Sequence, residues 1–149
     1  MPIQLAAPVM KDFTLDRSDL AYGNEGEATK VTVFQATQAE NERRALVHSE
    51  VTQIINAQSS MDAELRLYQK WSMEELKRIE VYLTMVGCNI LDRNGNDLFR
   101  FKNGDDHAHL DMTEAEFRKV WGKIPPDVAQ EIHEKVLEVN ITWAGPLAK

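Results

Sequence analysis

The chain has 149 residues, of which 43% are hydrophobic and 28% charged, and its formal net charge at pH 7 is −7. This length suits one domain, and this composition excludes a wholly disordered chain. The excess of negative charge argues against nucleic acid or an anionic membrane as a partner, because both are bound mainly through Lys and Arg.

The single cysteine, Cys88, excludes an intramolecular disulfide and is typical of a reducing compartment. The first five residues lack the basic residue and the long apolar run of a secretion signal. No stretch approaches the roughly 20 apolar residues that span a bilayer. We therefore expect a cytoplasmic protein.

Residues 1–29 combine scattered apolar side chains with prolines and glycines, and they show no sustained helical period. We predict an extended N-terminal arm with room for one short strand, ending in a loop at 23–27. An arm with apolar residues must dock on a surface, either the core of its own chain or a neighbouring subunit.

Residues 30–35 alternate with a period of two and are rich in β-branched and aromatic side chains, which predicts a half-buried strand. A helix is predicted over residues 38–57, with Thr37 and Glu40 forming a capping box at its start. Its apolar stripe follows helical spacing and consists of Val47, Val51, Ile54 and Ile55.

Residues 59–71 are compatible with both types of regular structure. Leu65 and Leu67 alternate with polar neighbours as in a strand, whereas Ala63 suits a helix. We favour a strand at 64–69.

A second helix is predicted to start at Ser72, which forms a capping box with Glu75. Its apolar seam consists of Leu76, Ile79, Leu83 and Val86, with Tyr82 beside it. We expect this helix to end near Gly87, since glycine commonly terminates helices in the left-handed conformation.

Residues 89–101 contain Asn94-Gly95 between two apolar runs, which is the strongest local signal for a β-hairpin. In a two-residue type I′ turn both central residues need a positive φ, and Asn and Gly tolerate it. A further turn is predicted at Asn103-Gly104.

The last part of the chain predicts two helices that meet at a corner. Thr113 and Glu116 form a third capping box, and the helix that they begin ends at Pro125. The next helix starts at the Pro125-Pro126 pair. Its apolar stripe consists of Val128, Ile132, Val136 and Val139.

Together these elements predict an α+β fold, mainly helical, with three or four helices on a small antiparallel sheet that includes the hairpin. We expect one globular domain over residues 30–140, preceded by the extended arm at 1–29. Residues 141–149 are predicted to form a C-terminal tail around Trp143, which could anchor either the body of the protein or a partner.

His107, His109 and Asp111 are the candidate metal ligands, because alternate residues of an extended segment point the same way and imidazole with carboxylate suits zinc. No third histidine lies nearby in the sequence, and a site needs three or four convergent ligands. A solvated loop is therefore the favoured interpretation, and we expect no metal and no cofactor.

Catalytic chemistry has little support in the sequence. Cys88 lies between a predicted helix and hairpin, where a small packing residue is commoner than a reactive thiol. No glycine-enclosed serine, phosphate-cradling loop or dinucleotide fingerprint occurs. We expect a protein that binds other proteins and is not an enzyme.

The C-terminal half resembles the tail assembly chaperones of tailed bacteriophages, which often end with a W-x-x-(I/L)-P-P-x-x-(A/V) helix corner. Here that corner begins at Trp121 and continues through Ile124-Pro125-Pro126 to Ala129. The resemblance covers about half of the chain and further involves residues 80–84, 88–91, 117–121 and 132–140.

This resemblance implies a cofactor-free, mainly helical protein that self-associates in the host cytoplasm. It also implies that the protein coats the helical tape measure protein, keeps it in solution and recruits tail tube subunits. Candidate contact residues lie on the apolar stripes and in the tail, although such stripes usually face a core. They are Val47, Val51, Ile55, Ile132, Val136, Val139 and Trp143.

Two other functions remain open on the sequence. The first is a structural subunit of the virion, in the capsid, neck or tail, whose N-terminal arm interlocks with a neighbour. The second is a small metal-binding domain centred on His107, His109 and Asp111.

Overall fold

The structure is a computed structural model that describes residues 9–15, 29–57, 63–104 and 107–144. It has an α+β fold with four α-helices and two small antiparallel sheets, as the sequence predicts. In chain order the elements are β1 (Met10–Thr14), β2 (Lys30–Phe34), α1 (Gln38–Ala57), α2 (Ala63–Thr84), β3 (Met85–Cys88), β4 (Phe101–Asn103), β5 (Ala108–Leu110), α3 (Glu114–Trp121), α4 (Pro126–Val139) and a short 3-10 helix, η2 (Ile141–Trp143).

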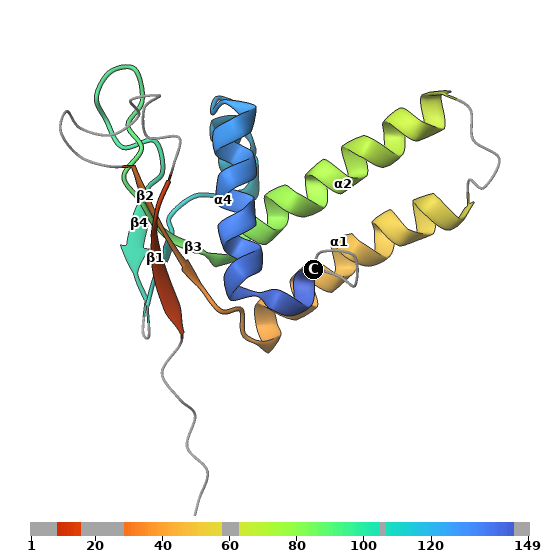
Figure 1. Ribbon diagram of the computed structural model, residues 1–149, viewed down its shortest axis with the longest axis horizontal. Coiled ribbons are helices and arrows are strands. Elements are labelled where there is room, and N and C mark those ends of the chain that lie inside the picture. The colour runs from red at the N-terminus through yellow and green to blue at the C-terminus, as the bar shows by residue number, and fades with distance from the viewer. Residues whose placement is uncertain (1–8, 16–28, 58–62, 105–106, 145–149) are drawn as a thin grey trace, which may run out of the picture.

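Figure 1 shows a body, made of the sheets with α3 and α4, and a helical hairpin of α1 and α2 that projects from it. At a rise of 1.5 Å per residue, the 20 residues of α1 and the 22 of α2 give a hairpin about 30 Å long. Near its base, α2 packs against both α3 and α4.

The three-stranded sheet places β2 between β1 and β3, both antiparallel to it. The strand predicted at 30–35 is confirmed as β2, and its alternation is real: Val31 and Val33 are fully buried in the core. β1 comes from the predicted N-terminal arm, and Leu15, directly after it, is buried in the same core. The described part of the arm therefore docks on its own chain.

The strand predicted at 64–69 is wrong, and so is the helix start at Ser72, because α2 runs without interruption through both. The segment is rich in Glu, Leu, Arg, Gln and Lys, and their helix propensity outweighs a short apolar alternation. The helix also ends before Gly87, which lies in β3 opposite Thr32. A Cβ at position 87 would come within 3.2 Å of the Thr32 hydroxyl oxygen, so glycine permits this close strand contact.

The chain reversal predicted at Asn94-Gly95 is confirmed, but its turn is longer than two residues. The Gly95 N–H donates to the Asp92 carbonyl at 3.1 Å, and the Asp92 N–H donates to the Asn96 carbonyl at 2.7 Å. Such a three-residue turn needs a positive φ at the glycine, which is +82° here. The adjoining strand pairing is one isolated bridge, and the chain then enters β4, which pairs with β5.

The predicted helix corner near the C-terminus is confirmed. Thr113 and Glu116 form both bonds of the capping box of α3, each at 3.2 Å, and Pro126 is the first residue of α4. At the start of α1 only half of the predicted box forms. The Glu40 carboxylate accepts from the Thr37 N–H at 2.9 Å, and the Thr37 hydroxyl donates to that same carboxylate.

The core fills the space between the three-stranded sheet, α2, α3 and α4. Phe117 of α3 is its aromatic centre, with ring centroids of Tyr82, Phe99 and Trp121 at 5.2, 5.7 and 5.6 Å. A smaller cluster at the hairpin base joins Val47 of α1 to α2, where it packs against Leu76, Ile79, Leu83 and Tyr82.

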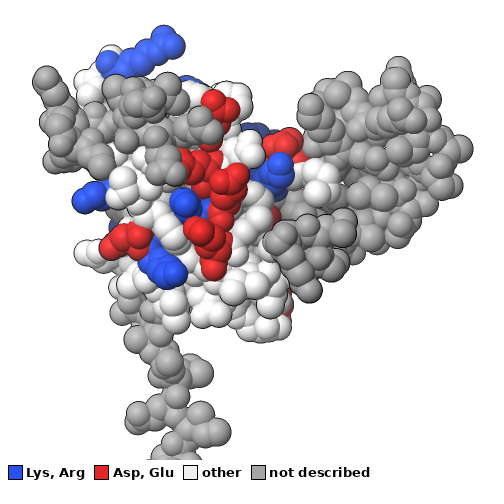
Figure 2. Space-filling model, in the orientation of Figure 1, with Lys and Arg blue, Asp and Glu red and all other residues white. Residues whose placement is uncertain are grey.

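The outer side of α4 is acidic. Asp127, Glu134 and Glu138 are exposed there, and Figure 2 shows a band of acidic side chains over this helix. No helix in the described ranges combines the length and the apolar character needed to cross a membrane.

Candidate functional site

A buried ionic cluster lies where the hairpin joins the body. Glu80 of α2 is only 3% exposed. Its two carboxylate oxygens contact Arg44 Nε of α1 at 2.7 Å and His133 Nε2 of α4 at 2.8 Å. Because a buried carboxylate is costly without partners, these contacts tie the two helices of the hairpin to α4.

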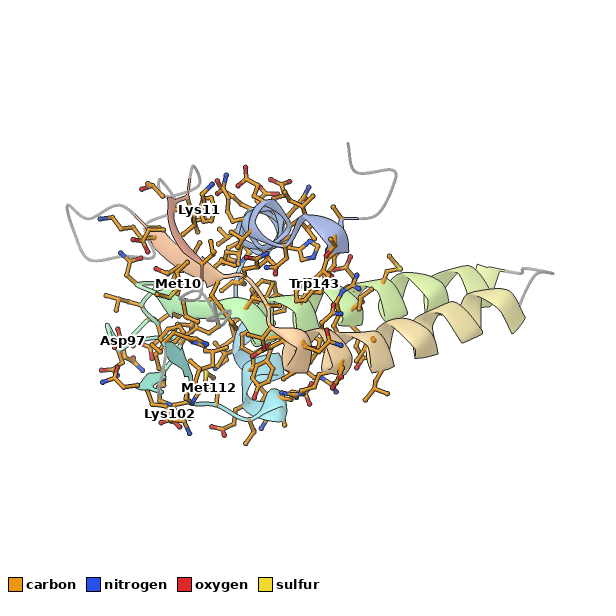
Figure 3. All side chains as sticks on the ribbon, turned by 90° about the horizontal axis from the view of Figure 1, so that it is seen from below. Met10, Lys11, Asp97, Lys102, Met112 and Trp143 are labelled. Atoms are coloured by element: carbon orange, nitrogen blue, oxygen red, sulfur yellow. The ribbon has the colours of Figure 1, made fainter. Side chains whose placement is uncertain are left out.

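Trp143 closes this cluster from the side of η2. Its indole N–H donates to Asn41 Oδ1 of α1 at 3.0 Å, and the Arg44 guanidinium lies 5.1 Å from its ring centroid. The ring is 8% exposed, and Figure 3 shows it at the junction of hairpin and body. The residue predicted to lie in a C-terminal tail is therefore part of the core in this chain.

The opposite side of the hairpin base is held by α3 and the segment before it. The Tyr82 hydroxyl donates to the Met112 carbonyl at 2.7 Å. Arg118 of α3 pairs with Glu75 of α2 at 3.0 Å. This exposed ion pair adds little stability by itself, but together with Tyr82 it fixes the side of α2 that faces α3. The hairpin base is thus clamped on two sides.

Among the hairpin side chains that the structure describes, two large apolar ones face solvent. Leu46 of α1 is 70% exposed and Met73 of α2 is 43% exposed. Single exposed apolar residues are common and carry no function by themselves. Both residues belong to the projecting hairpin.

The structure separates the residues predicted to contact a partner. Ile132 and Val136 are fully buried, whereas Val139 packs against the same core and stays partly exposed. Val47 is half-buried against α2. The side chains of Val51 and Ile55 lie outside the described part of α1.

The candidate metal ligands have other neighbours. The His107 ring stacks on Phe34 with centroids 4.2 Å apart, and its Nδ1 donates to the Ala108 carbonyl at 2.6 Å. Asp111 pairs with Lys102 at 3.6 Å, and His109 lies opposite Lys102 in the β4–β5 register. Across the described ranges, no three His, Cys, Asp or Glu side chains converge as metal ligands would.

Burial raises the pKa of the Cys88 thiol to about 11, and the nearby Asp97 carboxylate adds to this effect. The folded chain therefore holds the thiol proton more tightly than the unfolded chain, in which the pKa is about 8.5. The contribution of this group to stability is complete below the unfolded pKa and is lost as pH rises through the folded one.

We therefore predict that Cys88→Ala changes the pH dependence of stability only in alkali. The free energy of unfolding of the unsubstituted chain, relative to that of the variant, should stay constant up to about pH 8 and fall between roughly pH 9 and 11. Urea titrations of both chains across this range measure the difference. A difference that stays flat to pH 11 would contradict a buried, protonated thiol.

The fold and the site together define a small α+β body that carries a helical hairpin clamped at its base. Comparison of the chain with protein-family models, with curated proteins and with solved structures gave no match.

Proposed function

We propose that this chain is a non-enzymatic protein-binding module whose α1–α2 hairpin engages its partner. The observation that carries the proposal is the hairpin itself, which projects from the body while Glu80, Arg44 and Trp143 hold its base. Two antiparallel helices that are anchored at one end leave their remaining surface for a partner. An amphipathic helix is a suitable partner for such a pair, because it can lay its apolar face against the two helices.

The specific role that we propose is that of a tail assembly chaperone of a tailed bacteriophage. Its partners would be the helical tape measure protein, tail tube subunits and further copies of this chain, in the host cytoplasm and without a cofactor. The resemblance of the C-terminal half supports this role. The net charge of −7 and the acidic outer side of α4 would keep a complex with an apolar partner dispersed.

A structural subunit of the virion is the second candidate. Its function would require an N-terminal arm that interlocks with a neighbouring subunit. In this chain β1 pairs with β2 along its whole length, and Leu15 fills the chain's own core. Met10–Thr14 is therefore already used within the molecule, and an interlocking arm would need other residues. This observation favours the chaperone over the structural subunit.

Mass spectrometry of purified virions, combined with a pull-down from infected cells that uses this chain as bait, separates the two candidates. We expect recovery of the tape measure protein in the pull-down and absence of the chain from finished particles. Stoichiometric presence in particles would replace the chaperone with the structural subunit. Recovery of no phage protein, together with absence from particles, would remove both.

If the hairpin binds the partner, a substitution on its exposed surface should reduce recovery of the tape measure protein in the pull-down. Leu46→Ser should lower the recovered partner about tenfold, as loss of a central apolar contact does, and should leave stability unchanged because the side chain is 70% exposed. Ile141→Ser is the matched control, since Ile141 is 75% exposed but lies on η2 and not on the hairpin. Equal losses for both variants, or no loss for either, would contradict binding through this face of the hairpin.

A further inference from the structure

A surface cavity lies at the end of the body opposite the hairpin. It has a volume of about 720 Å³ and is formed by the loop after β3 together with the connection between α3 and α4. Figure 3 shows Asp97, which belongs to this loop, far from the free end of the hairpin. The cavity is thus separate from the surface that we propose for the protein partner, and an occupant there would be a second ligand.

Apolar side chains form part of the cavity wall. Leu91 and Leu98 come from the two sides of the loop, and Ile124 comes from the helix corner. Ile124 is also packed into the main core, which makes this wall firm. Cavities of about 300–1,000 Å³ with apolar walls and a few polar groups are typical binding sites for small ligands.

Two cations complete the wall, Arg93 from the loop and Lys123 from the helix corner. Neither has a carboxylate partner among the described residues, although the chain as a whole is acidic. Most other described cations are paired with a carboxylate, namely Arg43, Arg44, Lys77, Arg78, Arg100, Lys102, Arg118 and Lys135.

The acidic residue in the cavity wall, Asp92, forms hydrogen bonds within the turn. Its Oδ1 accepts from the N–H groups of Asn94 and Asn96 at 2.8 and 3.0 Å. These bonds hold the Asp92 carboxylate against the backbone of the loop, and among the described residues it forms no ion pair with Arg93 or Lys123. The cavity therefore combines an apolar wall with two positive charges and one negative charge, and neither positive charge is paired with a carboxylate of the described residues.

We propose that this cavity binds a carboxylate carried on a compact apolar body. The carboxylate would pair with Arg93 and Lys123, and the apolar body would cover Leu91, Leu98 and Ile124. An inorganic phosphate would satisfy the two cations but would gain nothing from the apolar wall. The same chemistry exists in a small organic acid and in the free C-terminus of a peptide that ends in an apolar residue.

The test uses the full chain labelled with ¹⁵N and 3-phenylpropionate as the probe. We expect a Kd of roughly 1 mM, as is ordinary for a ligand of this size, with shifts of amide resonances confined to residues 91–98 and 122–124. The neutral isostere 3-phenylpropanamide and inorganic phosphate should each bind about tenfold more weakly. A hydrophobic peptide with a free C-terminal leucine, compared with its C-terminal amide and with the small acid, distinguishes the two sources of the carboxylate.

Two double variants of equal charge localise the binding. Arg93→Gln with Lys123→Gln should weaken the probe about tenfold or more, whereas Lys30→Gln with Lys119→Gln should bind as the unsubstituted chain does. All four residues are exposed, so folding is preserved in both. Equal weakening in both variants, equal binding of the amide, or an absence of shifts at saturating probe would each overturn the proposal.

Discussion

Replacing Glu80 with glutamine should lower the free energy of unfolding by about 3 kcal/mol, measured by urea denaturation at neutral pH. The substitution keeps the size of the side chain but removes the charge that Arg44 and His133 contact at 2.7 and 2.8 Å. Arg44 would then keep its charge in a nearly buried position without a carboxylate to compensate it. Removing one member of a buried pair costs more than the pair itself contributes, because the remaining charge stays desolvated.

Glu74→Gln is the matched control for this prediction. Glu74 lies on the same helix and pairs with Lys77 at 3.2 Å, but both of these side chains are well exposed. Such a pair contributes at most about 0.5 kcal/mol. If the Glu80 and Glu74 variants lost the same small amount, the cluster would contribute nothing special to the attachment of the hairpin.

Replacing Trp143 with alanine should destabilise the chain by about 3–5 kcal/mol, which is the usual cost of removing a buried aromatic side chain. The ring is 8% exposed, donates to Asn41 and lies beneath the Arg44 guanidinium. Its loss would leave a void at the hairpin base and would uncover Arg44 to water. Thermal or urea unfolding measures the effect.

Ile141→Ala, in the same short helix, should change stability by no more than about 0.5 kcal/mol because Ile141 is exposed. The comparison also separates two roles for Trp143. If the indole serves only a partner, Trp143→Ala would leave stability unchanged and lower the recovery of the partner. A large loss of stability in the isolated chain would establish the structural role.

Local signals predicted the elements that local interactions determine. The capping box at Thr113 and the proline at position 126 gave the corner of α3 and α4, and alternation gave β2. The segment at 64–69 is helical and not a strand because six residues, fewer than two turns of a helix, are too few for apolar spacing alone to identify the element. The length of α2 and its high content of helix-forming residues distinguish a helix from a strand here.

The ionic cluster could not be predicted in the same way. Glu80 contacts residues that are 36 and 53 positions away in the sequence, so the packing of three helices creates the site. In the sequence, Arg44 lies on the polar face of the helix predicted at 38–57, which indicates an exposed side chain. His133 adjoins an apolar stripe, which indicates a partly buried histidine but names no partner. The pairing depends on the tertiary arrangement of α1, α2 and α4.

The direct passage from α2 into β3 also has a mechanical consequence. The helix ends at Thr84 and the strand begins at Met85, so no loop absorbs a change in the direction of the hairpin. A sideways load on the hairpin would be carried into the β2–β3 pairing, where the register already shifts between Thr32 and Val33. We therefore expect a load on the free end of the hairpin to reach the β2–β3 pairing, and hydrogen exchange of the β2 amide protons would report it some 30 Å away.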